Sequence, residues 1–139
     1  EMTLAAISHP LTMIASDGKL ENGRGHPRST GSYAKVLGRY VRELGVLDLM
    51  DALRRMTIAP AERLQQRAHS MTQKGRIRMG SDADLTIFNP DTVIDRSTYT
   101  EPDVPSEGIE YVLVNGVVVV DEGELVEGVR PGKPIRSLR

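Results

Sequence analysis

Residues 11–31 read LTMIASDGKLENGRGHPRSTG, an apolar run followed by a polar, glycine-rich loop. The run Leu11–Ala15 predicts a short buried strand, because apolar and β-branched side chains pack on both faces of a parallel sheet. Catalytic side chains of parallel α/β proteins gather beyond the carboxyl ends of the strands. We therefore take the loop that carries Asp17, His26 and Arg28 as the candidate site.

Each of these three side chains has a chemical and a structural interpretation. Asp17 is either a catalytic base or metal ligand, or a residue that caps the turn before Gly18. His26 is either a ligand or acid–base group, or a hydrogen-bonded loop residue. Arg28 either binds a carboxylate through its planar N–H donors or extends into solvent. The spacing of the residues leaves these alternatives open.

Helical patterns follow the loop. Apolar residues recur with helical spacing over residues 32–44, and Gly45 is a natural stop, so we expect a helix there. A second helix is expected over residues 47–56. A third helix has Pro60 in its first turn, where a missing N–H costs nothing, and continues to about residue 67.

The sequence beyond residue 74 has the character of short strands and turns. Lys74–Ile77 and Ala83–Phe88 predict strands. The strongest local signal is the pair of apolar runs joined by Asn115-Gly116, which predicts a β-hairpin with a type I′ turn. The polar segment Arg96–Pro105 is expected to be a surface loop. We place a boundary near residues 68–74, which divides the chain into domains at 1–70 and 71–139.

Composition narrows the classes of function. The 139 residues carry a net charge of -1, without the clustered basic excess of a nucleic-acid-binding protein. The longest apolar stretch, residues 111–120, is too short to span a bilayer, so we expect neither a nucleic acid nor a membrane partner. The absence of cysteine excludes disulfides and thiolate metal sites within the chain and fits a cytoplasmic location. Because the first residue is Glu, we expect a piece of a longer protein.

Several motifs together resemble a known family. They are M-I-A-S-D-G at 13–18, H-P-R-x-x-G at 26–31, V-L-G-R-Y-V-R-E at 36–43, T-x-x-P-A at 57–61, K-G-R-I at 74–77, G-S-D-A-D-L at 80–85 and the hairpin at 111–120. The last four resemble the C-terminal signature of the amidohydrolase superfamily. The first three resemble the N-acyl-D-amino-acid deacylases, also called D-aminoacylases.

The resemblance implies a fold. Members of this family have a metal-dependent (β/α)₈ barrel joined to a small β-sandwich. Leu11–Ala15 would be the last barrel strand, residues 32–67 the helices after it, and residues 74–139 the C-terminal part of the sandwich. The expected fold class is thus α/β plus β, as a fragment of a larger fold.

The resemblance also implies roles for the candidate residues. Asp17 matches the family aspartate beside the zinc, which takes a proton from metal-bound water and passes it to the leaving amine. Arg28 matches the arginine that holds the substrate's α-carboxylate, and His26 would shape this loop. The family's main zinc ligands have no counterpart in these residues, so Asp17 would be at most one metal ligand. We expect zinc in the full-length parent and no activity from the isolated chain.

The implied function is zinc-dependent hydrolysis of N-acyl-D-amino acids to a carboxylate and a D-amino acid. One alternative is a hydrolase of cyclic amides, of the hydantoinase or dihydroorotase type. Another is a non-catalytic assembly module. A truncated sandwich would expose strand edges, and such edges favour pairing, so we also expect homo-oligomers through the sheet edges.

Overall fold

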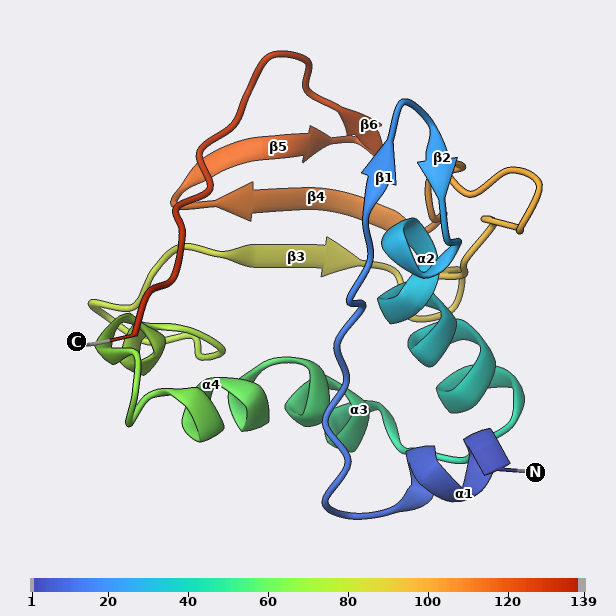
Figure 1. Ribbon diagram of the computed structural model, residues 1–139, viewed down its shortest axis with the longest axis horizontal. Coiled ribbons are helices and arrows are strands. Elements are labelled where there is room, and N and C mark those ends of the chain that lie inside the picture. Colours follow the sequence, from blue (N-terminus) through green and yellow to red (C-terminus); the bar gives the residue numbers. More distant parts are fainter. Residues whose placement is uncertain (1, 138–139) are drawn as a thin grey trace.

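The computed structural model describes residues 2–137, with helices in the N-terminal part and a sheet in the C-terminal part (Figure 1). In chain order the elements are α1 (Met2–Ser8), β1 (Leu20–Glu21), β2 (Arg24–Gly25), α2 (Arg28–Lys35), the π-helix η1 (Val36–Glu43), α3 (Leu49–Met56), α4 (Ile58–Leu64), the 3₁₀-helix η2 (His69–Gln73), β3 (Leu85–Phe88), β4 (Ile109–Val114), β5 (Val117–Asp121) and β6 (Glu124–Leu125). β3 to β6 form one antiparallel sheet in sequence order, and β1 and β2 form a separate hairpin. No closed barrel forms within residues 2–137.

The segment between α1 and β1 is extended, and it rises past the helices to the β1–β2 hairpin (Figure 1). The predicted strand Leu11–Ala15 does not form within residues 2–137, because these residues pair with no other strand of the described chain. Instead, the backbone N–H of Ile14 donates to the carbonyl of Arg55 in α3, at 3.1 Å. A strand needs a neighbouring strand for its ladder of hydrogen bonds, and here the neighbour is a helix.

The helix after the loop begins earlier than predicted. α2 starts at Arg28 rather than near residue 32, directly after Pro27 with φ -56°. The fixed φ of proline suits the start of a helix, so Pro27 was the signal for this boundary. The middle of the predicted helix is the π-helix η1, and Gly45 ends it with φ +58°, as expected.

The hairpin β4–β5 is confirmed. Asn115 and Gly116 both have positive φ, +49° and +78°, as a type I′ turn requires. The predicted strand Lys74–Ile77 is wrong: the segment bends at Gly75, whose φ is +68°. Strand β3 within Ala83–Phe88 is confirmed, two residues shorter than predicted.

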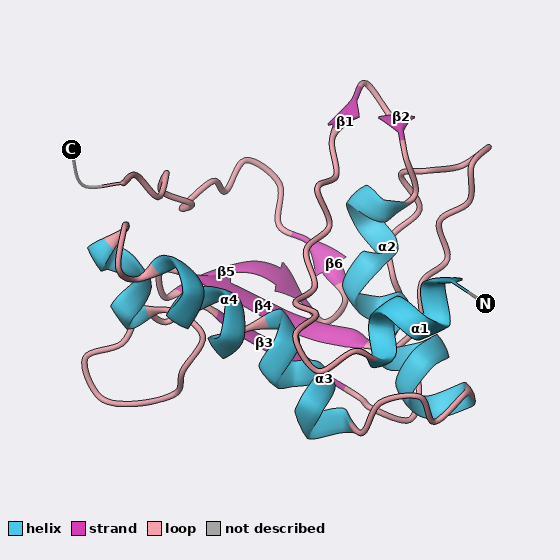
Figure 2. Cartoon of the chain, turned by 60° about the horizontal axis from the view of Figure 1, so that its bottom comes forward, coloured by secondary structure: helices cyan, strands magenta, loops and turns pink. Residues whose placement is uncertain are grey.

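Two apolar clusters hold the site in place. Ile7, Val36, Leu47 and Ala52 form one cluster, against which Ile14 of the extended segment packs. The other contains Ala34, Leu37 and Val93, with Phe88 and Ile109 of the sheet packed against it. This second cluster joins the helices to the sheet, and Figure 2 shows α3 beside the sheet. Within residues 2–137 no helix is both long and apolar enough to cross a membrane.

Candidate active site

The structure brings Asp17 and Arg28 together. Nη2 of Arg28 lies 3.3 Å from Oδ2 of Asp17, although eleven positions separate the two residues in the chain. The Asp17 side chain is 90% exposed and that of Arg28 is 48% exposed, so both charged groups are open to an incoming molecule. Asp17 has φ +46°, a conformation uncommon outside glycine.

The backbone around Asp17 packs directly on the first turn of α2. A Cβ added to Gly18 would lie 2.4 Å from Cα of Ser29, which no side chain tolerates. Glycine therefore permits the close approach that places the Asp17 carboxylate beside Arg28. The unusual φ of Asp17 directs the chain into this contact.

His26 shapes the start of α2. Its Nδ1 accepts a hydrogen bond from the backbone N–H of Arg28 at 3.0 Å, and its carbonyl accepts one from the N–H of Ser29 at 2.9 Å. The imidazole also meets the ring of Tyr99 edge-on, with centroids 5.0 Å apart and an interplanar angle of 77°. One ring nitrogen of His26 is thus engaged in local structure.

A cavity of about 570 Å³ opens beside this group. Its wall combines the first turns of α2 with the segment 95–99 of the long loop before β4, and it includes His26, Arg28 and Tyr99. Arg28 therefore has Asp17 within reach of its guanidinium and lines a hollow large enough for a small molecule.

A zinc site does not form from these residues. Within residues 2–137 no three histidine, cysteine or acidic side chains come together as a metal would require. Asp17 supplies one exposed carboxylate, and its partner is a guanidinium rather than a second ligand. Zinc sites in enzymes take three protein ligands, so this set does not fit the metal by itself.

A second acidic pair has a structural role. Asp82 and Asp84 both contact the Nζ of Lys74, the former at 2.9 Å, so both carboxylates point toward the same ammonium group. The other oxygen of Asp84 accepts a hydrogen bond from the N–H of Asn115 at 2.8 Å, which ties it to the hairpin turn. Burial favours a raised pKa for Asp84, but the hydrogen bonds from Asn115 and Lys74 outweigh it and hold the pKa below its usual value.

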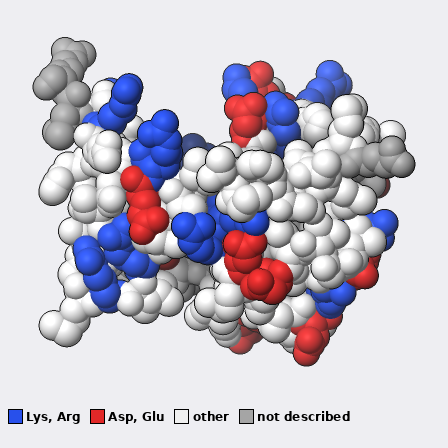
Figure 3. All heavy atoms as spheres, turned by 90° about the horizontal axis from the view of Figure 1, so that it is seen from below, with Lys and Arg blue, Asp and Glu red and all other residues white. Residues whose placement is uncertain are grey.

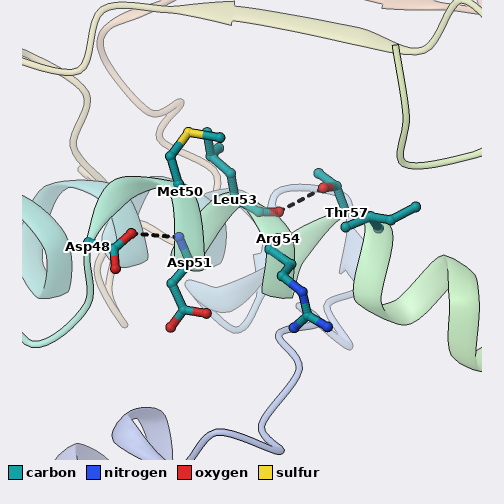
Figure 4. A pocket seen from close by; sticks show the side chains of 7 residues that line it. Asp48, Met50, Asp51, Leu53, Arg54 and Thr57 are labelled. Atoms are coloured by element: carbon teal, nitrogen blue, oxygen red, sulfur yellow. Dashed lines mark hydrogen bonds between the residues drawn. The ribbon is translucent and has the colours of Figure 1, made fainter. Parts of the chain in front are cut away.

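A hollow of about 540 Å³ lies between α3 and α4 (Figure 4). The two carboxylates in its wall, those of Asp48 and Asp51, stabilise α3. Asp48 caps α3 by accepting the N–H of Asp51 at 2.8 Å, and Asp51 itself pairs with Arg55. On the face seen from below, basic and acidic side chains lie side by side rather than in separate patches (Figure 3).

A model of the amidohydrolase family matches residues 3–120. The chain belongs to the amidohydrolase family. Among curated relatives, this amidohydrolase chain is 41% identical over 128 residues to an N-acyl-D-glutamate deacylase of Alcaligenes xylosoxydans xylosoxydans, covering 92% of this chain and 25% of that protein. It is 40% identical over 111 residues to a D-aminoacylase of the same organism, covering 80% of this chain and 22% of that protein. The chain thus spans about a quarter of the length of these relatives.

Solved structures agree with this family. A D-aminoacylase superimposes with a TM-score of 0.84 at 33% identity, over 96% of this amidohydrolase chain and 27% of that one. An N-acyl-D-glutamate deacylase from Bordetella bronchiseptica superimposes with a TM-score of 0.82 at 41% identity, over the same shares. That enzyme was solved with zinc and a phosphonate inhibitor that mimics the tetrahedral intermediate of its reaction.

Sequence reasoning missed the contribution of the long loop before β4. Arg96–Pro105 is a largely exposed loop, as predicted, but its Tyr99 also meets His26 edge-on, which the sequence did not reveal. Aromatic residues make up only 4% of the sequence, and an aromatic residue in a polar loop was the available signal.

Proposed function

We propose that this chain is the C-terminal portion of a zinc-dependent enzyme that hydrolyses N-acyl-D-amino acids to a carboxylate and a D-amino acid. The observation that carries the proposal is the pair of exposed charged groups, Asp17 and Arg28, held 3.3 Å apart beside a cavity. The deacylases among the relatives support the choice of substrate.

Arg28 would bind the α-carboxylate of the substrate. Its guanidinium already pairs with a carboxylate, that of Asp17, and a guanidinium can bind a second carboxylate through its other N–H groups. The N–H groups of Arg28, Ser29 and Gly31 at the start of α2 are all taken, by His26 and Pro27. An incoming anion would therefore meet the side chain of Arg28 rather than the helix end.

Asp17 would move the proton. A carboxylate within reach of the scissile amide can accept a proton from the attacking water and return it to the leaving nitrogen. The carboxylate is 90% exposed, so a substrate can reach it beside Arg28. Zinc supplies, when bound, an activated water at neutral pH, and its ligands would come from parts of the enzyme outside these residues. The isolated chain would then be inactive.

In the whole enzyme we place residues 1–70 at the end of a barrel and residues 71–139 in a sandwich. The extended segment before Asp17 would gain strand partners there, which would convert it into the last barrel strand. Self-association through the edge strands β3 and β6, and a cytoplasmic location, stay predictions.

The test uses the full-length protein with Arg28→Ala. For an N-acetyl-D-amino acid, KM should rise about 10- to 100-fold, the size of a lost charge-assisted hydrogen-bonded pair. The matched control is Arg24→Ala, an exposed arginine of the nearby hairpin, which should leave KM unchanged. Turnover of a cyclic amide, with KM unaffected by Arg28→Ala, would instead support the hydantoinase-type alternative.

A further inference from the structure

The long loop before β4 is hydrogen-bonded to the beginning of α2. We refer to residues 95–106 as the clamp loop. Oγ of Ser97 donates to the carbonyl of Pro27 at 2.9 Å, and Oγ of Ser106 donates to the carbonyl of Thr30 at 2.9 Å. In return, Oγ1 of Thr30 donates to the carbonyl of Pro102 at 2.8 Å. These three partly buried bonds join segments about seventy positions apart, on both sides of Arg28.

The clamp loop can approach α2 closely because residue 31 is a glycine. Gly31 is buried, and a Cβ there would lie 2.7 Å from Oγ of Ser97 and 2.9 Å from Cβ of Asp95. One turn further along α2, Lys35 pairs with Asp95 at 3.3 Å. The absence of a side chain at Gly31 thus permits a contact that any other residue would push apart.

Tyr99 connects the clamp loop to His26 and, through it, to Arg28. Its ring meets His26 edge-on, and the Nδ1 of His26 accepts the backbone N–H of Arg28. Edge-to-face aromatic pairs have a preferred geometry, so the tyrosine, although 79% exposed, favours this orientation of the imidazole. A rotated imidazole would lose its hydrogen bond to Arg28 and loosen the first turn that aims the guanidinium.

We propose that Tyr99 is a positioning residue for Arg28, acting through His26, and that the clamp loop holds the carboxylate-binding end of the site. This inference rests on the proposed function, because it assigns Tyr99 a part in binding the substrate's α-carboxylate. In this proposal Tyr99 contacts no reacting atom. Its side chain orients His26, and His26 in turn holds the backbone of Arg28, so its effect should fall on binding rather than on the proton transfer at Asp17.

The experiment measures kcat and KM of the full-length protein as Tyr99→Ala and Tyr99→Phe. Tyr99→Ala should raise KM for an N-acetyl-D-amino acid about three- to tenfold, the size of one aromatic edge contact, with kcat within about twofold. Tyr99→Phe keeps the ring and should restore the original KM. For an N-acetyl amine that lacks the α-carboxylate, Tyr99→Ala should leave KM unchanged.

Two further variants distinguish a failure of this inference from a failure of the proposed function. Tyr99→Ala should add nothing in an Arg28→Ala background, because the residue it positions is gone. Gly31→Ala should raise KM as Tyr99→Ala does, although alanine favours the helix itself. An equal rise in KM with and without Arg28, or on the carboxylate-free substrate, would overturn the inference. So would an unchanged KM in Tyr99→Ala beside a raised KM in Arg28→Ala. An unchanged KM in Arg28→Ala would overturn the proposed function, and this inference with it.

Discussion

The extended segment that carries Asp17 and the sheet β3–β6, which Asp84 directly precedes, differ in where their hydrogen-bond partners lie. In the sheet, β3 to β6 pair with one another, and Asp84 accepts from Lys74 and from the hairpin turn. The Asp17 segment has no strand partner in the described chain, and its carboxylate is 90% exposed. Asp84 stabilises the fold through these contacts, whereas we propose that the exposed Asp17 takes part in the chemistry. This difference predicts unequal losses of stability when contacts in the two regions are removed.

The largest loss of stability is expected from Arg55→Met. Arg55 is 5% exposed, and its Nη1 donates to the carbonyls of Ile7 and His9 at 2.9 and 2.7 Å. Its other nitrogens bind Asp51. Arg55 therefore connects α3 to the start of the extended segment that leads to Asp17. The substitution removes the buried guanidinium and leaves two carbonyls and the carboxylate of Asp51 without their donor, which should cost about 3 kcal/mol, measured by urea unfolding.

The matched control for Arg55→Met is the same substitution at the preceding residue, Arg54. Arg54 is exposed and extends away from α3 (Figure 4). Arg54→Met should change the unfolding free energy by less than about 0.5 kcal/mol. Equal effects of the two substitutions would show that Arg55 does not anchor the segment.

Asp84→Ala should have an intermediate effect. The substitution removes the ion pair with Lys74 and leaves the N–H of Asn115 without its acceptor. We expect a loss of about 2 kcal/mol, against less than about 1 kcal/mol for the control Asp82→Ala, which removes only an ion pair.

The pH dependence of unfolding provides a second measurement on the same pair. Burial alone would raise the pKa of Asp84, but its hydrogen bonds hold the pKa below the usual value. The stabilisation from Asp84 is therefore complete above the unfolded pKa of about 3.9 and is lost as the pH falls through the lower folded pKa. Asp84→Ala should reduce this loss at acid pH, and an unchanged acid profile would contradict the assigned role of Asp84.

Sequence predictions were correct where the interacting residues lie close together in the chain. The hairpin was predictable because Asn115 and Gly116 adopt the turn and both strands lie in the chain. The segment 11–15 has the composition of a buried strand, but a strand also needs neighbours, and none lies among the described residues. The contact of Tyr99 with His26 joins residues far apart in sequence, and no local pattern encodes such a contact. The apolar pattern likewise did not reveal the start of α2 at Arg28, although Pro27 marks it.

The central claim is that Asp17 is placed for chemistry and contributes little to the fold. Its most direct test is Asp17→Asn in the full-length protein, with the melting temperature and kcat/KM for an N-acetyl-D-amino acid measured on the same preparation. We predict an unchanged melting temperature, because the side chain is 90% exposed, and a fall in kcat/KM of at least about 100-fold, typical for loss of a general base. Retained activity together with a lowered melting temperature would contradict the claim and make Asp17 a structural residue.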